Sequence, residues 1–277
     1  MNVQNVSDGP VTEMRTVRFE AARVSRNLYT QHMTYRLLKA VLGPLLRLLF
    51  KVRVEGLDNV PASGPVILAS NHVSFSDSIF LPMVLKRRVT FVAKAEYFEQ
   101  RKTAWFFRAT GQIPVKRGGG PASARALDAA KEVLDAGEVF AIYPEGTRSP
   151  DGRLYKGRTG VARLALDANC PVLAVAMIGT REAQPIGQVK PNFFMPITIK
   201  FSPPMRFDRY KARRDDPRTL RSITDEIMFE LSQMSGQVYV NDYAPKKQAD
   251  PGELVELPSV SVRVAPEEKP VLVSASA

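Results

Sequence analysis

Two side chains that could share a proton transfer stand five residues apart, His72 and Asp77. An imidazole can take the proton of a substrate hydroxyl, and a carboxylate on its other nitrogen fixes the tautomer and stabilises the imidazolium. His72 follows an apolar run typical of a strand, and Ser74 or Ser76 could cap the helix that comes next. A turn between the two would bring carboxylate and imidazole together. The alternative is a structural histidine, with Asp77 only complementing the helix dipole.

Three basic residues each come just after a predicted strand: Lys94, Arg117 and Arg148. The carboxyl ends of parallel strands share one edge of an open α/β sheet, so these cations would converge there on a phosphate dianion. Each charge-assisted hydrogen bond would contribute roughly 1.5 to 3 kcal/mol. For each cation taken alone, a solvated surface position is the alternative. The loop that holds Arg148, residues 144–149 (PEGTRS), runs into a Pro-Asp-Gly turn signal.

Four segments, in this order, resemble the motif blocks of the glycerolipid acyltransferases: Asn71-His72 with Asp77, residues 111–117, residues 145–149 and residues 170–172. The resemblance covers roughly residues 60–180 and implies that His72 is the general base and that Asp77 orients it. It also implies that the glycerol phosphate acceptor is held by a set of polar and glycine residues: Lys94, Arg117, Glu145, Gly146, Thr147 and Arg148. The fourth block has Ala174 where the family usually has a second proline, which bears on the acyl pocket and not on the base.

The same resemblance implies a reaction that needs no cofactor. A fatty acyl group would pass from acyl-CoA or acyl carrier protein to the free hydroxyl of a phosphorylated glycerolipid acceptor, lysophosphatidate, to give phosphatidate. Glycerol 3-phosphate and other lysophospholipids are alternative acceptors. A covalent acyl-serine is not expected, because Ser74 lacks the flanking glycines of a nucleophile elbow. One cysteine and two histidines give no zinc-like spacing, so no metal is expected.

Short β-branched runs alternate with longer amphipathic stretches, which predicts an α/β fold with a mostly parallel central sheet flanked by helices. Two helices stand out, one from Pro121 to Gly137 and one from Asp216 to Gly236. Six strands are predicted: 65–70, 89–93, 112–116, 138–143, 172–178 and 197–201. The predicted organisation is a disordered tail (1–16), an amphipathic helical segment (17–53), a catalytic domain (54–244) and a second disordered tail (245–277).

The formal charge of +11 calls for an anionic partner. Between residues 21 and 53 there are seven basic residues and no acidic one, and residues 37–50 are rich in leucine. This composition favours an interfacial helix on an anionic membrane surface, and the alternative is a first helix packed on the sheet. Without a secretory signal, a cytoplasmic protein held peripherally at the inner face of the membrane is expected. No nucleic acid is expected, although a non-enzymatic basic lipid- or nucleic-acid-binding protein is the rival of another class.

Overall fold

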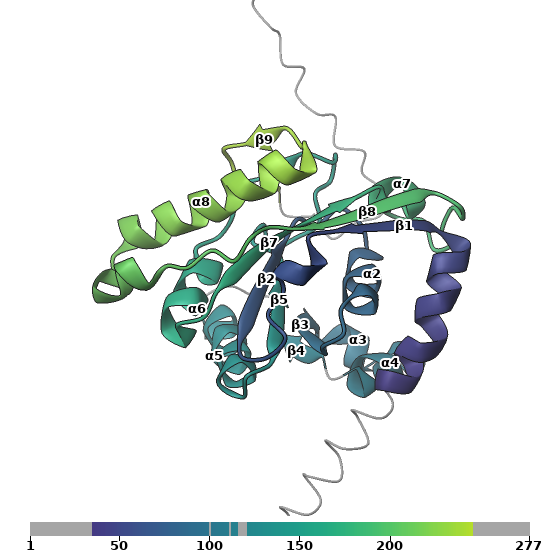
Figure 1. Cartoon of the computed structure of the whole chain (residues 1–277), viewed down its shortest axis with the longest axis horizontal. Coiled ribbons are helices and arrows are strands. Elements are labelled where there is room, and N and C mark those ends of the chain that lie inside the picture. The colour runs from purple at the N-terminus through teal and green to yellow at the C-terminus, as the bar shows by residue number, and fades with distance from the viewer. Residues whose placement is uncertain (1–34, 100, 111, 116–120, 246–277) are drawn as a thin grey trace, which may run out of the picture. The chain divides into compact units, whose positions relative to one another are not determined.

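The computed structural model describes residues 35–99, 101–110, 112–115 and 121–245. Helix and strand alternate along most of this part of the chain (Figure 1). Residues 35–49 are helical and are called the pre-β1 helix below. The strands are β1 (Lys51–Glu55), β2 (Val66–Ser70), β3 (Val89–Lys94), β4 (Ile113–Val115), β5 (Val139–Ile142), β6 (Leu154–Tyr155), β7 (Val172–Ile178), β8 (Pro196–Phe201) and β9 (Tyr239–Val240). The helices are η1 (Leu57–Asn59), α2 (Asp77–Val84), α3 (Glu96–Glu99), α4 (Arg101–Ala109), α5 (Pro121–Asp135), α6 (Gly160–Ala168), α7 (Thr180–Ala183), η2 (Asp208–Arg213) and α8 (Pro217–Ser235).

Seven of the strands form one sheet in the order β1-β8-β7-β2-β5-β3-β4. The strands from β7 to β4 in this order run parallel, whereas β8 is antiparallel to β7 and β1 is parallel to β8. Parallel neighbours need crossover connections, and these are the helices that cover the sheet. The predicted α/β fold with a mostly parallel sheet flanked by helices is therefore confirmed.

The central strand β2 is buried along its whole length, as its unbroken apolar sequence predicts. Ile67 and Ala69 point into a cluster formed with α5, α6 and α8, whereas Val66 and Leu68 point into a second cluster that includes α2. Burial of each large aliphatic side chain stabilises the fold by about 1.5 to 3 kcal/mol. A core thus lies on each face of the sheet and holds its strands in place.

The two predicted helices are confirmed as α5 and α8. Asp216 caps α8 by accepting from the amides of Arg218 and Thr219, and Gly236 ends it in the left-handed conformation at φ 69°. The predicted strands are confirmed as β2, β3, β4, β5, β7 and β8, with boundaries that shift by a residue or so.

One prediction needs correction at its boundary. The helical segment 17–53 was predicted to include residues that the structure places in β1, because alternating Val52 and Val54 pair with β8. The two-residue strands β6 and β9, which pair with each other, were not predicted either. The predicted tails 1–16 and 245–277 lie outside the described residues, except for Pro245. Their disorder and the proposed domain boundaries stay predictions.

The reversed direction of β1 and β8 matters for the site. Because β8 is antiparallel to β7, its start lies at the edge where the parallel strands end, and Ile178 at the end of β7 pairs with Thr198. Lys51, the first residue of β1, pairs with Pro196 at the same edge. The chain that enters these two strands is joined by a hydrogen bond from the Phe194 amide to the Leu49 carbonyl, at 2.7 Å.

Candidate active site

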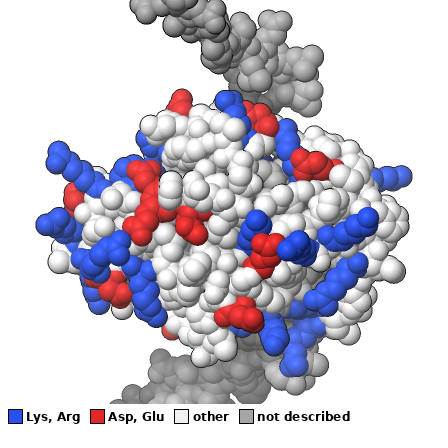
Figure 2. Space-filling model, turned by 45° about the horizontal axis from the view of Figure 1, so that its top comes forward, with Lys and Arg blue, Asp and Glu red and all other residues white. Residues whose placement is uncertain are grey.

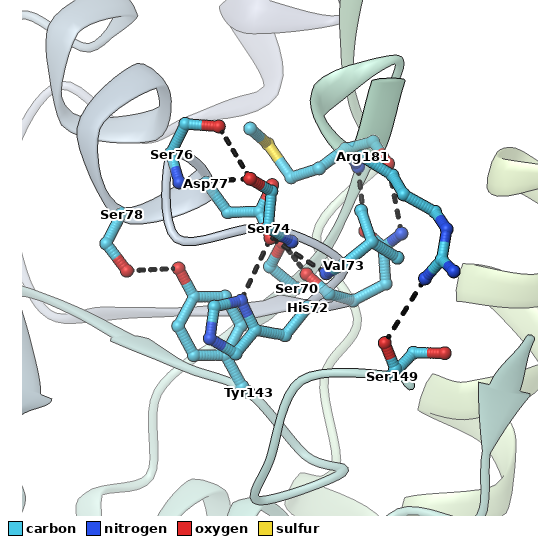
Figure 3. Close-up of polar contacts among 12 residues, drawn as sticks. Ser70, His72, Val73, Ser74, Ser76, Asp77, Ser78, Tyr143, Ser149 and Arg181 are labelled. Carbon is cyan, nitrogen blue, oxygen red and sulfur yellow. Dashed lines mark hydrogen bonds and ion pairs between the residues drawn. The ribbon is translucent and has the colours of Figure 1, made fainter. Parts of the chain in front are cut away.

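His72 and Asp77 meet beyond the carboxyl end of β2. Nδ1 of His72 lies 2.9 Å from Oδ2 of Asp77, whose side chain is fully buried, while 16% of the His72 side chain is exposed (Figure 3). An ionised carboxylate only accepts, so Nδ1 carries the proton and Nε2 keeps a free lone pair. The predicted approach of the two side chains is therefore present in the structure. It provides a partly accessible base with a buried anionic partner.

The turn, and not a helix face, brings Asp77 to the histidine. Oδ2 of Asp77 also accepts from the amides of Val73 and Ser74, each at 2.8 Å. The prediction that Ser74 or Ser76 caps the helix by its side chain is wrong, because the N-cap Ser76 makes no such bond. The Ser74 hydroxyl instead accepts from the Ser76 amide and donates to the Gln184 carbonyl. Three donors on one oxygen fix the carboxylate.

Tyr143 is a site residue that the sequence did not single out. Its ring stacks on the imidazole of His72, with centroids 3.8 Å apart and an interplanar angle of 9° (Figure 3). Its hydroxyl is hydrogen-bonded to that of Ser78 at 2.7 Å. Burial, reinforced by the charge of Asp77, raises the pKa of Tyr143 well above its usual value, so the phenol is neutral. The stack sets the orientation of the ring, and the only sequence signal was an aromatic at the end of a buried strand.

Glu145 is buried beneath the loop, with 1% of the residue exposed. One carboxylate oxygen accepts from the amide of His72 at 3.3 Å and the other from the amide of Tyr155 at 2.9 Å. Burial raises the pKa of Glu145 to about 7, against the lowering effect of these two amide bonds. Both oxygens thus bind the backbone of this chain, so Glu145 is placed to position His72. Its predicted contact with the acceptor stays a prediction.

The rest of the loop is fastened to the histidine turn. The Ser149 amide donates to the His72 carbonyl at 2.7 Å, and the guanidinium of Arg181 donates to the carbonyls of Ser149 and Pro150. Gly146 adopts φ +75°, and a Cβ there would lie 3.0 Å from Nε of Arg158. A side chain at this position would be both strained and crowded, which accounts for the glycine without a contact to substrate.

The predicted cations are placed to different extents. Arg148 is half-buried and has no hydrogen-bond or ion-pair partner among the described residues. The same holds for the half-buried Thr147 beside it. Lys94 was predicted to follow the strand and is instead the last residue of β3. Its side chain lies outside the described part of the structure. Arg117 lies outside the described residues. The phosphate cradle formed by all three therefore stays a prediction.

The residues of the fourth block are buried at the start of β7. Cys170 is buried, and burial raises the pKa of its thiol to about 12, so it is not a nucleophile near neutral pH. Ala174 is buried in β7, and its amide donates to the hydroxyl of Ser202 at 2.9 Å. A proline at 174 would remove that donor. In this chain the residue belongs to the sheet core.

Comparison with known proteins agrees with this geometry. Residues 51–178 match the family model described as Acyltransferase. The chain is 32% identical over 139 residues to a chloroplastic 1-acyl-sn-glycerol-3-phosphate acyltransferase of Arabidopsis thaliana, covering 50% of this chain and 39% of that protein. It is 28% identical over 179 residues to an enzyme of the same name from Limnanthes alba, covering 64% and 63%.

Among solved structures, the fold resembles the crystal structure of the 1-acyl-sn-glycerophosphate acyltransferase PlsC from Thermotoga maritima. The TM-score is 0.56 at 25% identity, over 81% of this chain and 89% of that chain. The alignments span about two fifths of the first chloroplastic relatives, 39% and 40% of their lengths. The family match at residues 51–178 thus includes His72, Asp77 and the 144–149 loop.

Proposed function

We propose that this protein is a 1-acyl-sn-glycerol-3-phosphate acyltransferase. It transfers a fatty acyl group from a thioester, acyl-CoA or acyl carrier protein, to the free hydroxyl of lysophosphatidate and forms phosphatidate. The observation that carries the proposal is the 2.9 Å bond between Nδ1 of His72 and the buried Asp77, which leaves Nε2 as a base at the sheet edge. The names of the relatives support the same reaction.

The proposed chemistry is a direct transfer. Nε2 of His72 takes the hydroxyl proton as the oxygen attacks the thioester carbonyl, the carbon–sulfur bond breaks, and the imidazolium returns the proton to the leaving thiolate. Asp77 stabilises the imidazolium, and the stacked Tyr143 keeps the ring in the plane that faces the acceptor. A positioned general base contributes about 10²- to 10⁴-fold.

The purified full chain tests the proposal directly. Lysophosphatidate is incubated with acyl-CoA or with acyl carrier protein, and phosphatidate is measured by mass spectrometry. Glycerol 3-phosphate and lysophosphatidylcholine serve as alternative acceptors. Phosphatidate formation with either donor supports the proposal, and the preferred donor identifies the second substrate. A protein that binds lysophosphatidate vesicles yet transfers no acyl group to any of the three acceptors would contradict it.

Arg148 supplies a prediction about the acceptor, because its half-buried guanidinium has no partner in the described part of the chain. Arg148→Ala should raise KM for lysophosphatidate about 10-fold or more, since one charge-assisted bond to phosphate contributes roughly 1.5 to 3 kcal/mol. KM for a phosphate-free monoacylglycerol should not change. The exposed Arg125 on α5 offers a matched control, Arg125→Ala. Equal losses with both acceptors would show that Arg148 does not bind phosphate.

We also propose that the pre-β1 helix lies on an anionic membrane surface. Four apolar side chains follow one side of it and are exposed: Leu37 (68%), Val41 (61%), Leu45 (43%) and Leu48 (74%). Two other leucines of the same helix, Leu46 and Leu49, pack on the core. Exposed Arg36 and Arg47 flank the outer leucines and suit lipid phosphates. The basic excess is also visible in Figure 2, where lysine and arginine side chains spread along both sides of the face drawn.

None of the helices in the described part of the chain has the length and apolar character of a membrane span. The double variant Leu37→Glu/Leu48→Glu should reduce co-flotation with phosphatidylglycerol vesicles at least about 10-fold, because each buried leucine contributes roughly 1.5 to 3 kcal/mol. Asp128→Lys, a charge change at an exposed position of α5, is the control. Unchanged flotation of the double variant would exclude the pre-β1 helix as the membrane contact.

A further inference from the structure

A closed ring of hydrogen bonds runs through the backbone of His72 and through a glutamine far away in sequence. Asn71, the residue before the histidine, donates from Nδ2 to Oε1 of Gln237 at 2.7 Å. Gln237 donates from Nε2 to the carbonyl of Gly152 at 2.6 Å. The Gly152 amide donates to the Ser149 hydroxyl at 3.0 Å, and the Ser149 amide closes the ring on the His72 carbonyl at 2.7 Å.

Both sides of this ring are rigid. Asn71 is fully buried and also binds β7, donating to the carbonyl of Met177 and accepting from its amide. Ser149 is fully buried as well. Gln237 is the one side chain of the ring that comes from the C-terminal part of the fold, and it lies outside the family match at 51–178. Its side chain joins the residue before His72 to Gly152 and belongs to neither segment.

The end of α8 holds Gln237 in place. Gly236 terminates the helix, the Gln237 amide donates to Oγ of Ser235, and its carbonyl accepts from Oγ of Ser232. Immediately afterwards the chain pairs as β9 with β6, which continues the loop. An amide side chain that donates on one end and accepts on the other is required here, because Asn71 offers a donor and Gly152 an acceptor.

We propose that Gln237 is a positioning residue for His72, a role that rests on the proposed acyltransferase function. By joining Asn71 to the 149–152 loop it sets the distance between the base and the loop that carries Arg148. Both ends of its side-chain amide bond to this chain, so its loss should change the turnover step and leave substrate binding intact. Misplacement of a reacting group by about 1 Å can lower the rate about 10²-fold, and a smaller displacement of His72 lowers it less.

The test uses the full chain and three variants. Gln237→Met keeps the length of the side chain and removes both hydrogen bonds. Gln237→Glu keeps both bonds only while the new carboxyl is protonated, because the ionised form cannot donate to Gly152. Gln233→Met, at an exposed position of α8, is the matched control. For each protein, kcat, KM for both substrates and Tm are measured from pH 5 to 8.

Gln237→Met should lower kcat about 10-fold with KM within about 2-fold of wild type, and Gln233→Met should change neither. For Gln237→Glu, kcat relative to wild type should rise as the pH falls. A lowered Tm with unchanged kcat would overturn the proposal and leave Gln237 only a structural role.

A second readout does not depend on activity. The chain has two histidines, so its imidazole NMR signals are few, and His72→Ala assigns those of His72. The stacked Tyr143 makes these signals sensitive to ring position. Gln237→Met should shift the His72 signals while Gln233→Met leaves them in place. If wild type transfers no acyl group, the proposed function fails, and the NMR comparison still decides whether Gln237 positions His72. Unmoved signals contradict the inference.

Discussion

Replacing His72 by alanine should lower acyl transfer to lysophosphatidate by at least about 10²-fold. The imidazole is partly exposed and its Nδ1 is bonded to the buried Asp77, which leaves Nε2 to take the proton. Without it the hydroxyl must lose its proton to water, which is a poor base at neutral pH. The loss should appear in kcat, because the ring is not needed to hold the acceptor's phosphate. Initial rates with purified wild type and variant provide the measurement.

The fold should survive this substitution, because His72 lies beyond the end of β2 and its backbone bonds to Glu145 and Ser149 remain. Equal circular dichroism and equal flotation with vesicles are the controls. A non-enzymatic lipid binder predicts no effect of His72→Ala on its function. Residual transfer within about 3-fold of wild type would remove His72 from the role of base and with it the proposed mechanism.

Asp77→Asn should lower kcat by about 10²-fold or more. The amide of asparagine can still accept from Val73 and Ser74, but it is uncharged and no longer stabilises an imidazolium. If its NH₂ group faces the ring, it donates to Nδ1 and turns Nε2 into a donor, which cannot take a proton. Oδ1 of Asp77 is buried without a hydrogen-bond partner in the described residues, so an NH₂ group there would also be unsatisfied.

The two variants can be compared with Asp128→Asn, a change at an exposed carboxylate on α5. It should leave kcat unchanged. An Asp77→Asn variant with normal kcat would show that Asp77 serves only to hold the turn.

The sequence predicted the sheet well because its central strands are buried on both faces. Residues 66–69 and 172–178 are unbroken apolar runs, and such short runs are typical of strands buried in a parallel sheet. The helices α5 and α8 were equally readable, since a proline opens each and a glycine follows each. The pairing of His72 with Asp77 was also predicted, because five residues fit a turn and not a helix face.

Other features depend on contacts between distant residues. The stack of Tyr143 on His72 joins positions 71 apart in sequence, and no local pattern marks it. Gln237 reaches Asn71 across 166 positions for the same reason. Glu145 was predicted to face the acceptor, yet its burial could not be read from a loop of ordinary composition. The strand β1 was missed because leucines upstream extended the helical pattern into residues 51–53.

The reversal of β1 and β8 has a consequence for how a lipid could reach the base. It puts the end of the pre-β1 helix at the same edge as His72, separated by the strands β8 and β7 in the order β1-β8-β7-β2. At about 4.8 Å a strand, this is a lateral step of roughly 14 Å. With the proposed membrane contact of that helix, an acceptor in the bilayer would need to move only this far sideways to reach the base. Its tail would stay in the hydrocarbon while the glycerol hydroxyl arrives.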